Sequence, residues 1–300
     1  MTAPDASAPV PPRGNSRARR AWLVVRAMLR EPAGWFGLSL VAAHLLLAIF
    51  APLLVPYNAT AMDAGAILGE PSMAHPLGTD HLGRDILTRT MLGGREALIV
   101  TGIGTPAALV WGGLLGIFTG LVGGRFDEVL MRIVDAFLSL PWILKLLVLV
   151  VTFGTTNAVL IPTLAFFFGI PVIRVARAAT HEVVARDFIQ AARARGHGRA
   201  SIMMRELLPN VTGPLMVEGA MRWSWMLLAF SSLSFLGFGA TPPTPDWGLM
   251  ISDGRLYMTV ALWGVLGPMV ALASLIIGIN LVADALAIVM RVDHSRRDEI

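Results

Sequence analysis

The chain has 300 residues, of which 55% are hydrophobic and 15% charged, with a net charge of +4 and a mean hydropathy of +0.67. Because an ordinary globular protein carries roughly 25% charged residues, this composition excludes soluble, fibrous and disordered classes and indicates a membrane protein. The absence of cysteine further excludes a disulfide framework and thiolate metal or redox sites.

The first 30 residues are predicted to form a disordered, basic cytoplasmic tail. Residues 1–20 are rich in Pro, Ala and Arg and show no apolar periodicity. We expect their arginines to lie near the anionic headgroups of membrane lipid. The apolar run at 32–62 is far longer than the core of a cleaved signal peptide, so it predicts an uncleaved first span.

Charge-poor windows follow one another along the rest of the chain, each long enough for a spanning helix of about 20 residues. The window at 136–173 is too long for one helix, holds one charged residue, Lys145, and contains a turn-like Gly-Thr-Thr-Asn at 154–157. It therefore predicts two spans. The predicted fold is an all-α polytopic membrane protein with six transmembrane helices, at about 34–55, 97–122, 136–154, 158–177, 213–238 and 262–290.

The basic residues predict the orientation of these spans. If both termini are cytoplasmic, the inner segments hold 18 of the 24 Lys and Arg residues, whereas the outer segments hold four and the spans two. Such a bias fixes both ends inside. Since the placement of charge explains the small net excess, we expect membrane lipid and no nucleic acid as a partner.

The outer loop at 56–96 is too long for a simple connection. Its residues 86–92 predict a short amphipathic helix that rests on the outer membrane surface. The four domains predicted from the whole pattern are the tail at 1–30, the first span and outer loop at 31–96, a five-helix core at 97–290 and a cytoplasmic tail at 291–300.

Enzyme chemistry is weakly supported. A P-loop needs a lysine next to Ser or Thr, and the single lysine, Lys145, lies between leucines. The segment 181–185 resembles a zinc-protease helix, but Ala185 stands where the second histidine ligand is required. We therefore predict no catalytic residue, no metal site and no cofactor bound by this chain.

The loop between the fourth and fifth spans is the most informative segment. Its pattern predicts one short helix at 181–195 that stops at Gly196, and a second at 199–207 that ends at Pro209. Small residues and an apolar strip surrounded by arginines favour insertion into a groove of a partner protein. The alternative is an interfacial loop whose arginines are solvated at the headgroups.

These residues resemble a motif of ATP-binding-cassette importer permeases, E-A-A…G…L-P. The matching residues are Gln190, Ala191, Ala192, Gly196, Leu208 and Pro209. Gln190 replaces the usual Glu, which keeps the length of the side chain and removes its charge. Other segments resemble the C-type permease subunit of dipeptide, oligopeptide and nickel importers, and they lie at 50–57, 75–85, 233–239 and 242–248.

The resemblance implies a type I importer fold in the bacterial cytoplasmic (inner) membrane. It implies that the chain forms half of a translocation path with a homologous second permease. Two ABC ATPase domains, which hold ATP and Mg, would dock on the loop at 181–209, and an extracytoplasmic solute-binding protein would deliver the cargo. The six matching residues would carry the coupling to the ATPases.

Lys145 and Phe230 depart from the family pattern and are predicted to line the translocation path. Lys145 attracts a carboxylate in this interpretation, and in the alternative it snorkels or faces a wet cavity. Glu218 and Arg222 are four residues apart, so they share a helix face and are predicted to pair. The cargo stays open among dipeptides, oligopeptides, nickel and glutathione.

Two other classes of function remain as alternatives. One is a proton- or ion-coupled secondary transporter that uses Lys145, Glu218 and Asp284 as its ionisable groups. The other is a membrane scaffold without transport. By itself the pattern of residues leaves all three open, and the resemblance favours the importer.

Overall fold

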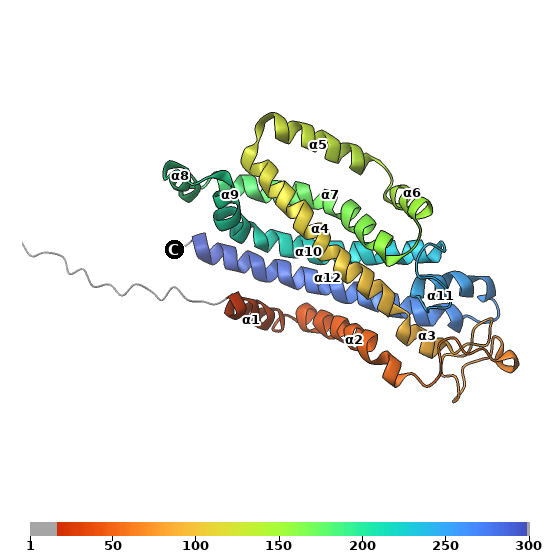
Figure 1. The fold of residues 1–300 in the computed structure, drawn as a ribbon. Helices are drawn as coiled ribbons and strands as arrows, with labels where there is room; N and C mark the ends of the chain where they lie inside the picture. The colour runs from red at the N-terminus through yellow and green to blue at the C-terminus, as the bar shows by residue number, and fades with distance from the viewer. Residues whose placement is uncertain (1–16, 299–300) are drawn as a thin grey trace, which may run out of the picture.

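The computed structural model describes residues 17–298, which fold into a bundle of helices (Figure 1). A single isolated β-bridge joins Thr79 and Asp85 in the part described. The helices are α1 (Arg17–Met28), α2 (Pro32–Leu54), α3 (Ile86–Leu92), α4 (Gly94–Val122), α5 (Gly124–Ser139), α6 (Trp142–Phe153), α7 (Asn157–Val184), α8 (Asp187–Ala194), α9 (Arg199–Ile202), α10 (Leu208–Phe235), α11 (Trp247–Gly254) and α12 (Trp263–Asp298).

Helices α4 and α7 form the closest pair in the bundle, and glycines make this approach possible. Gly112, Gly116 and Gly120 lie four residues apart on α4 and so face the same side. A Cβ atom at Gly112 would lie 2.3 Å from the Gly169 carbonyl oxygen, and one at Gly116 would lie 2.4 Å from that of Ile173. Small residues at this spacing let two helices pack backbone to backbone within a membrane.

The two ends of the bundle have different contents (Figure 1). The start of α1 and the end of α12 lie at one end, together with α8 and α9, whereas α3, α6 and α11 lie at the other. The long helices α2, α4, α7, α10 and α12 run between these ends. The two sets of connecting segments are therefore separated by the length of the bundle.

Four helical segments are long and apolar enough to cross a membrane, namely Pro32–Leu54, Ile86–Val122, Asn157–Val184 and Trp263–Met290. A fifth is reached if α5 and α6 count as one bent span. Helix α10 is not among them because Glu218, Arg222 and several serines lower its hydropathy.

The predicted third span, at 136–154, is not a single helix. Helix α5 ends at Ser139 and α6 begins at Trp142, and the two axes are bent by 85°. The residue before a proline is disfavoured in the α conformation, and Leu140 has an extended backbone before Pro141. The window that appears continuous in hydropathy is therefore broken by backbone geometry.

The amino-terminal segment also differs from the prediction. Helix α1 occupies Arg17–Met28 within the tail predicted to be disordered, and residues 1–16 lie outside the described residues. Met28 is buried against Ala285 and Leu286 of α12, which gives α1 an apolar anchor. At the other terminus α12 continues as helix to Asp298, through most of the predicted tail.

The short outer helix predicted at 86–92 is present as α3, but it does not lie on the membrane surface. Ile86, Thr88 and Arg89 are buried, and α3 continues into α4 as one helical run from Ile86 to Val122. Arg89 donates a hydrogen bond of 2.8 Å from Nη1 to the carbonyl oxygen of Ala59. The outer loop therefore folds over α3 and covers it.

Candidate coupling surface and translocation pocket

Helices α8 and α9 form a hairpin at the end of the bundle that also holds the end of α12 (Figure 1). Helix α8 ends in a Schellman motif, in which the His197 N–H donates to the carbonyl of Ala192 at 3.2 Å and the Gly196 N–H to that of Arg193 at 2.9 Å. Gly196 has a φ of +78°, the left-handed conformation that this motif requires. The predicted turn at Gly196 is therefore present.

The boundaries of the two predicted helices were wrong. Helix α7 extends to Val184, so α8 starts only at Asp187. The second helix does not end at Pro209, because a π-turn at Met203–Leu207 leads directly into α10. The wider π-turn accommodates a proline, which lacks an N–H and clashes with the carbonyl four residues earlier in an ordinary α-helix.

One face of the hairpin is anchored in a buried apolar cluster. Ile189 and Ala192 of α8 are completely buried, as are Leu207 and Val211 after the π-turn. They pack together with residues of α4 and α7. The members of this cluster are Ile117, Leu121, Ala176, Val183, Ile189, Ala192, Ile202, Leu207 and Val211.

The opposite face of the hairpin is exposed. Phe188 is 38% exposed, and Gln190, Ala191 and Pro209 are exposed too, whereas Leu208 is half-buried. The predicted apolar strip is therefore divided between two faces, with Ile189 and Ile202 inside and Phe188 outside. An exposed face on a rigidly anchored hairpin suits contact with a second protein.

A separate pocket of about 260 Å³ lies between α5, α6, α7 and α10. Lys145 is part of its wall, as is Arg222, and aromatic side chains make up much of the rest. Trp142 and Lys145 are three residues apart on α6, so they share one helix face. This spacing is visible in the sequence and could have indicated the pocket. The lining residues are Leu138, Trp142, Lys145, Leu146, Phe167, Phe168, Pro171, Arg222, Trp225, Leu228 and Ala229.

Lys145 has two contacts inside the protein. Its ammonium donates a hydrogen bond of 2.6 Å to the carbonyl oxygen of Phe137, one of the last carbonyls of α5 that have no partner within their own helix. The same Nζ atom lies 5.5 Å from the centre of the Phe167 ring. The lysine therefore bridges the break between α5 and α6.

The predicted pairing of Glu218 and Arg222 is confirmed. Arg222 donates from Nε to the Glu218 carboxylate at 2.5 Å, and the side chain of Glu218 is 9% exposed. Phe230, by contrast, is completely buried in the core and does not line the pocket with Lys145. Asp284 is exposed on α12, so it too is apart from this pocket.

The sequence pattern did not predict the ion pairs that attach α5 to α7. Arg177 makes two hydrogen bonds to the Asp127 carboxylate, and Arg174 lies 3.3 Å from Asp135. Their partners are 39 to 50 residues apart in the chain, so no local spacing rule brings them together.

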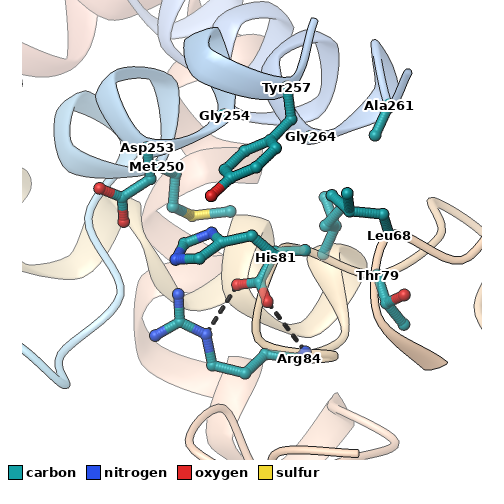
Figure 2. A pocket seen from close by; sticks show the side chains of 12 residues that line it. Leu68, Thr79, His81, Arg84, Met250, Asp253, Gly254, Tyr257, Ala261 and Gly264 are labelled. Carbon is teal, nitrogen blue, oxygen red and sulfur yellow. Dashed lines mark hydrogen bonds and ion pairs between the residues drawn. The ribbon is translucent and has the colours of Figure 1, made fainter. Parts of the chain in front are cut away.

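A smaller pocket lies beneath the outer loops (Figure 2). The ring of His81 stacks on Tyr257 at 5.3 Å, and Arg84 pairs with Asp80 at 2.7 Å below them. Its volume of about 20 Å³ accommodates one water molecule, which is too little for a transported solute. This pocket therefore belongs to the packing of the outer loops.

Comparison with known proteins agrees with this architecture. Residues 112–290 match the family described as binding-protein-dependent transport system inner membrane component. Residues 16–71 match the N-terminal transmembrane domain of oligopeptide transport permease C. The two matches divide the chain between its first span with part of the outer loop and most of its helical core.

Individual relatives cover nearly the whole chain. The dipeptide transport system permease protein DppC of Escherichia coli K12 is 38% identical over 266 residues, 86% of this chain and 88% of the relative. DppC of Alkalihalophilus pseudofirmus is 31% identical over 288 residues, 95% of this chain and 94% of the relative. The glutathione transport system permease protein GsiD of Pectobacterium atrosepticum is 33% identical over 263 residues, 87% and 86% of the two chains.

These matches decide between the classes of function that the sequence pattern left open. The match to a family of binding-protein-dependent transport components favours the importer over an ion-coupled secondary transporter and over a scaffold. It also accounts for a chain with several membrane helices and no P-loop lysine. The chain belongs to the permease subunits of binding-protein-dependent ABC importers, and it is therefore a transport subunit of the inner membrane and not an enzyme.

Proposed function

We propose that this chain imports dipeptides or closely related short peptides, as one half of a translocation path whose other half is a homologous permease. The support for this cargo is the naming of its relatives, which include dipeptide, di/tripeptide and glutathione permeases. A solute-binding protein outside the membrane delivers the cargo. Specificity beyond short peptides rests with that protein.

The proposed topology has six spans and both termini in the cytoplasm. Helix α5, continued by α6 after the bend, and helix α10 join the four apolar segments as spans, because α5 and α10 run along the bundle beside them (Figure 1). The described ends of the chain lie at the same end of the bundle as α8 and α9. The positive-inside bias assigns that end to the cytoplasm.

ATPase subunits, which bind ATP and Mg, dock on the α8–α9 hairpin in this proposal. The observation that carries it is the two-sided hairpin, exposed at Phe188 and Gln190 and fixed by the buried Ile189 and Ala192. Gln190 and Ala191 make the contact, and Gly196 and Pro209 shape the turns on either side of it. Leu208 and Ala192 join the hairpin to the bundle. In the proposed domain division, residues 97–290 form the core of the permease and residues 31–96 form a separate amino-terminal unit.

Mild-detergent purification of the tagged chain from its native host tests this proposal. We expect mass spectrometry to identify a second permease and P-loop ATPases, and membrane vesicles to take up dipeptides only with ATP and the binding protein. Recovery of the chain alone, together with uptake that is independent of ATP, would contradict the proposal.

A further inference from the structure

The pocket between α5, α6, α7 and α10 contains an excess of positive charge. Two cations, Lys145 and Arg222, are among its lining residues, and none of the lining residues is acidic. Glu218 neutralises Arg222 through the hydrogen bond to its guanidinium, but no carboxylate forms a hydrogen bond or ion pair with Lys145 among the interactions found in residues 17–298. The pocket therefore has one uncompensated positive charge.

Lys145 is half-buried in the wall of this pocket. A cation near the middle of a membrane helix costs about 2.5–3.5 kcal/mol on insertion scales, and such groups face a bundle interior or a water-filled path. Trp142 and Trp225 are 43% and 54% exposed beside it. The pocket is therefore lined by both large aromatic side chains and a cation.

The lysine is held in place before any ligand arrives. Its bond to the Phe137 carbonyl uses one of the three ammonium donors, and the Phe167 ring lies against the same group. Two donors are left for a ligand in the pocket. A carboxylate accepts such charge-assisted hydrogen bonds better than a neutral group does.

We infer that this pocket binds a carboxylate group of the solute through Lys145, while the apolar part of the solute packs against Trp142 and Trp225. The inference rests on the proposed function and assigns the chemistry of its site. For a peptide, the group that fits is the terminal carboxylate. Lys145 is the only lysine in the chain, so no other lysine can make this bond.

Direct binding to the purified permease–ATPase complex, without the binding protein, tests this inference. The probes are N-acetylphenylalanine and its amide, which have the same shape and differ in the carboxylate, and calorimetry measures both affinities. We expect the wild type to bind the carboxylate about tenfold more tightly, since a net bond to a charged group stabilises by roughly 1.5 kcal/mol or more. Lys145→Met removes this preference, and Lys145→Arg retains it.

A control and two contrary outcomes complete the test. Arg95→Met, which removes an exposed cation at the start of α4, leaves the preference unchanged. If Lys145 only holds the end of α5, Lys145→Met weakens both probes equally, and the inference is wrong. Equal affinity of the wild type for the two probes, or no binding of the carboxylate, also overturns it. ATP-dependent dipeptide uptake by the same complex with its binding protein tests the proposed function separately.

Discussion

Gly196 and Gly198 lie in the same exposed turn and differ in backbone conformation. Both have open space where a Cβ atom would be placed, but φ is +78° at Gly196 and −67° at Gly198. A left-handed backbone costs an L-residue roughly 1–2 kcal/mol. We expect Gly196→Ala to lower the ratio of ordered to disordered turn by about five- to thirtyfold and so to lower ATP-dependent uptake. Gly198→Ala leaves uptake at the wild-type rate. Equal uptake by the two variants would remove the turn from the coupling mechanism.

Asp246 predicts a pH dependence of stability outside the spanning helices. Burial raises its pKa from 3.8 to about 6, while its side chain caps α11 by accepting from the Leu249 N–H at 3.1 Å. The folded protein therefore binds this proton more tightly than the unfolded chain does, so the contribution of this group to stability falls as pH rises from about 4 to 6. Above that window the contribution is constant.

The variant Asp246→Asn isolates this effect, because asparagine is also a good helix cap and does not titrate. We expect thermal unfolding in detergent, followed between pH 4 and 7, to show a smaller fall in unfolding temperature for Asp246→Asn than for the wild type. Identical pH profiles would mean that Asp246 ionises normally in the folded protein.

At the scale of elements, two ion pairs of unequal burial attach α5 to α7. The side chain of Asp127 is 11% exposed in its pair with Arg177, whereas Asp135 is 49% exposed in its pair with Arg174. Removing one partner of a buried charged hydrogen bond destabilises by about 2 kcal/mol, and exposed pairs contribute less than about 1 kcal/mol. We expect Asp127→Ala to lower the unfolding temperature in detergent clearly more than Asp135→Ala. Equal shifts would show that the shielded pair is no stronger.

Hydropathy and spacing predicted most elements, and the errors have local backbone causes. Long apolar windows predicted both ends of α2 and α4 and the starts of α7 and α12 within three residues, whereas α7 and α12 continue to Val184 and Asp298, beyond the predicted ends at 177 and 290. The break at Pro141 was missed because the span at 136–154 was set by hydropathy without regard to that proline. The π-turn before Pro209 was missed because that proline was expected to end the helix and not to widen it. Whether it does so depends on the neighbouring helices, and no window of sequence contains them.

The candidate site was predictable only in part. The turn at Gly196 and the pairing of Glu218 with Arg222 depend on residues close in sequence, so they followed from local rules of helix ends and helix faces. The cation pocket depends on four helices, and its lining by Phe167 and Trp225 required the packing of α7 against α6 and α10. Lys145 alone marked it in advance, as a charge within an apolar window.

At the scale of the whole molecule, the hairpin has one face for a partner and one for the bundle, and the two faces predict opposite effects. Phe188→Asp changes the exposed face, so we expect it to abolish ATPase co-purification while the unfolding temperature stays unchanged. Ile189→Ala leaves a cavity in the buried cluster, so it costs about 2–5 kcal/mol and lowers the unfolding temperature. If Phe188→Asp still co-purifies with the ATPases, the exposed face at Phe188 is not the docking surface.

The helical run from Ile86 to Val122 connects the outer loops with the buried cluster behind the hairpin. Its 37 residues correspond to about 55 Å at 1.5 Å per residue. Trp247 packs against its outer part at Gly94, and Ile117 and Leu121 belong to the cluster at its inner part. One continuous helix thus joins the packing site of Trp247 at one end of the bundle to the buried cluster behind the hairpin at the other, so both ends share a single structural element.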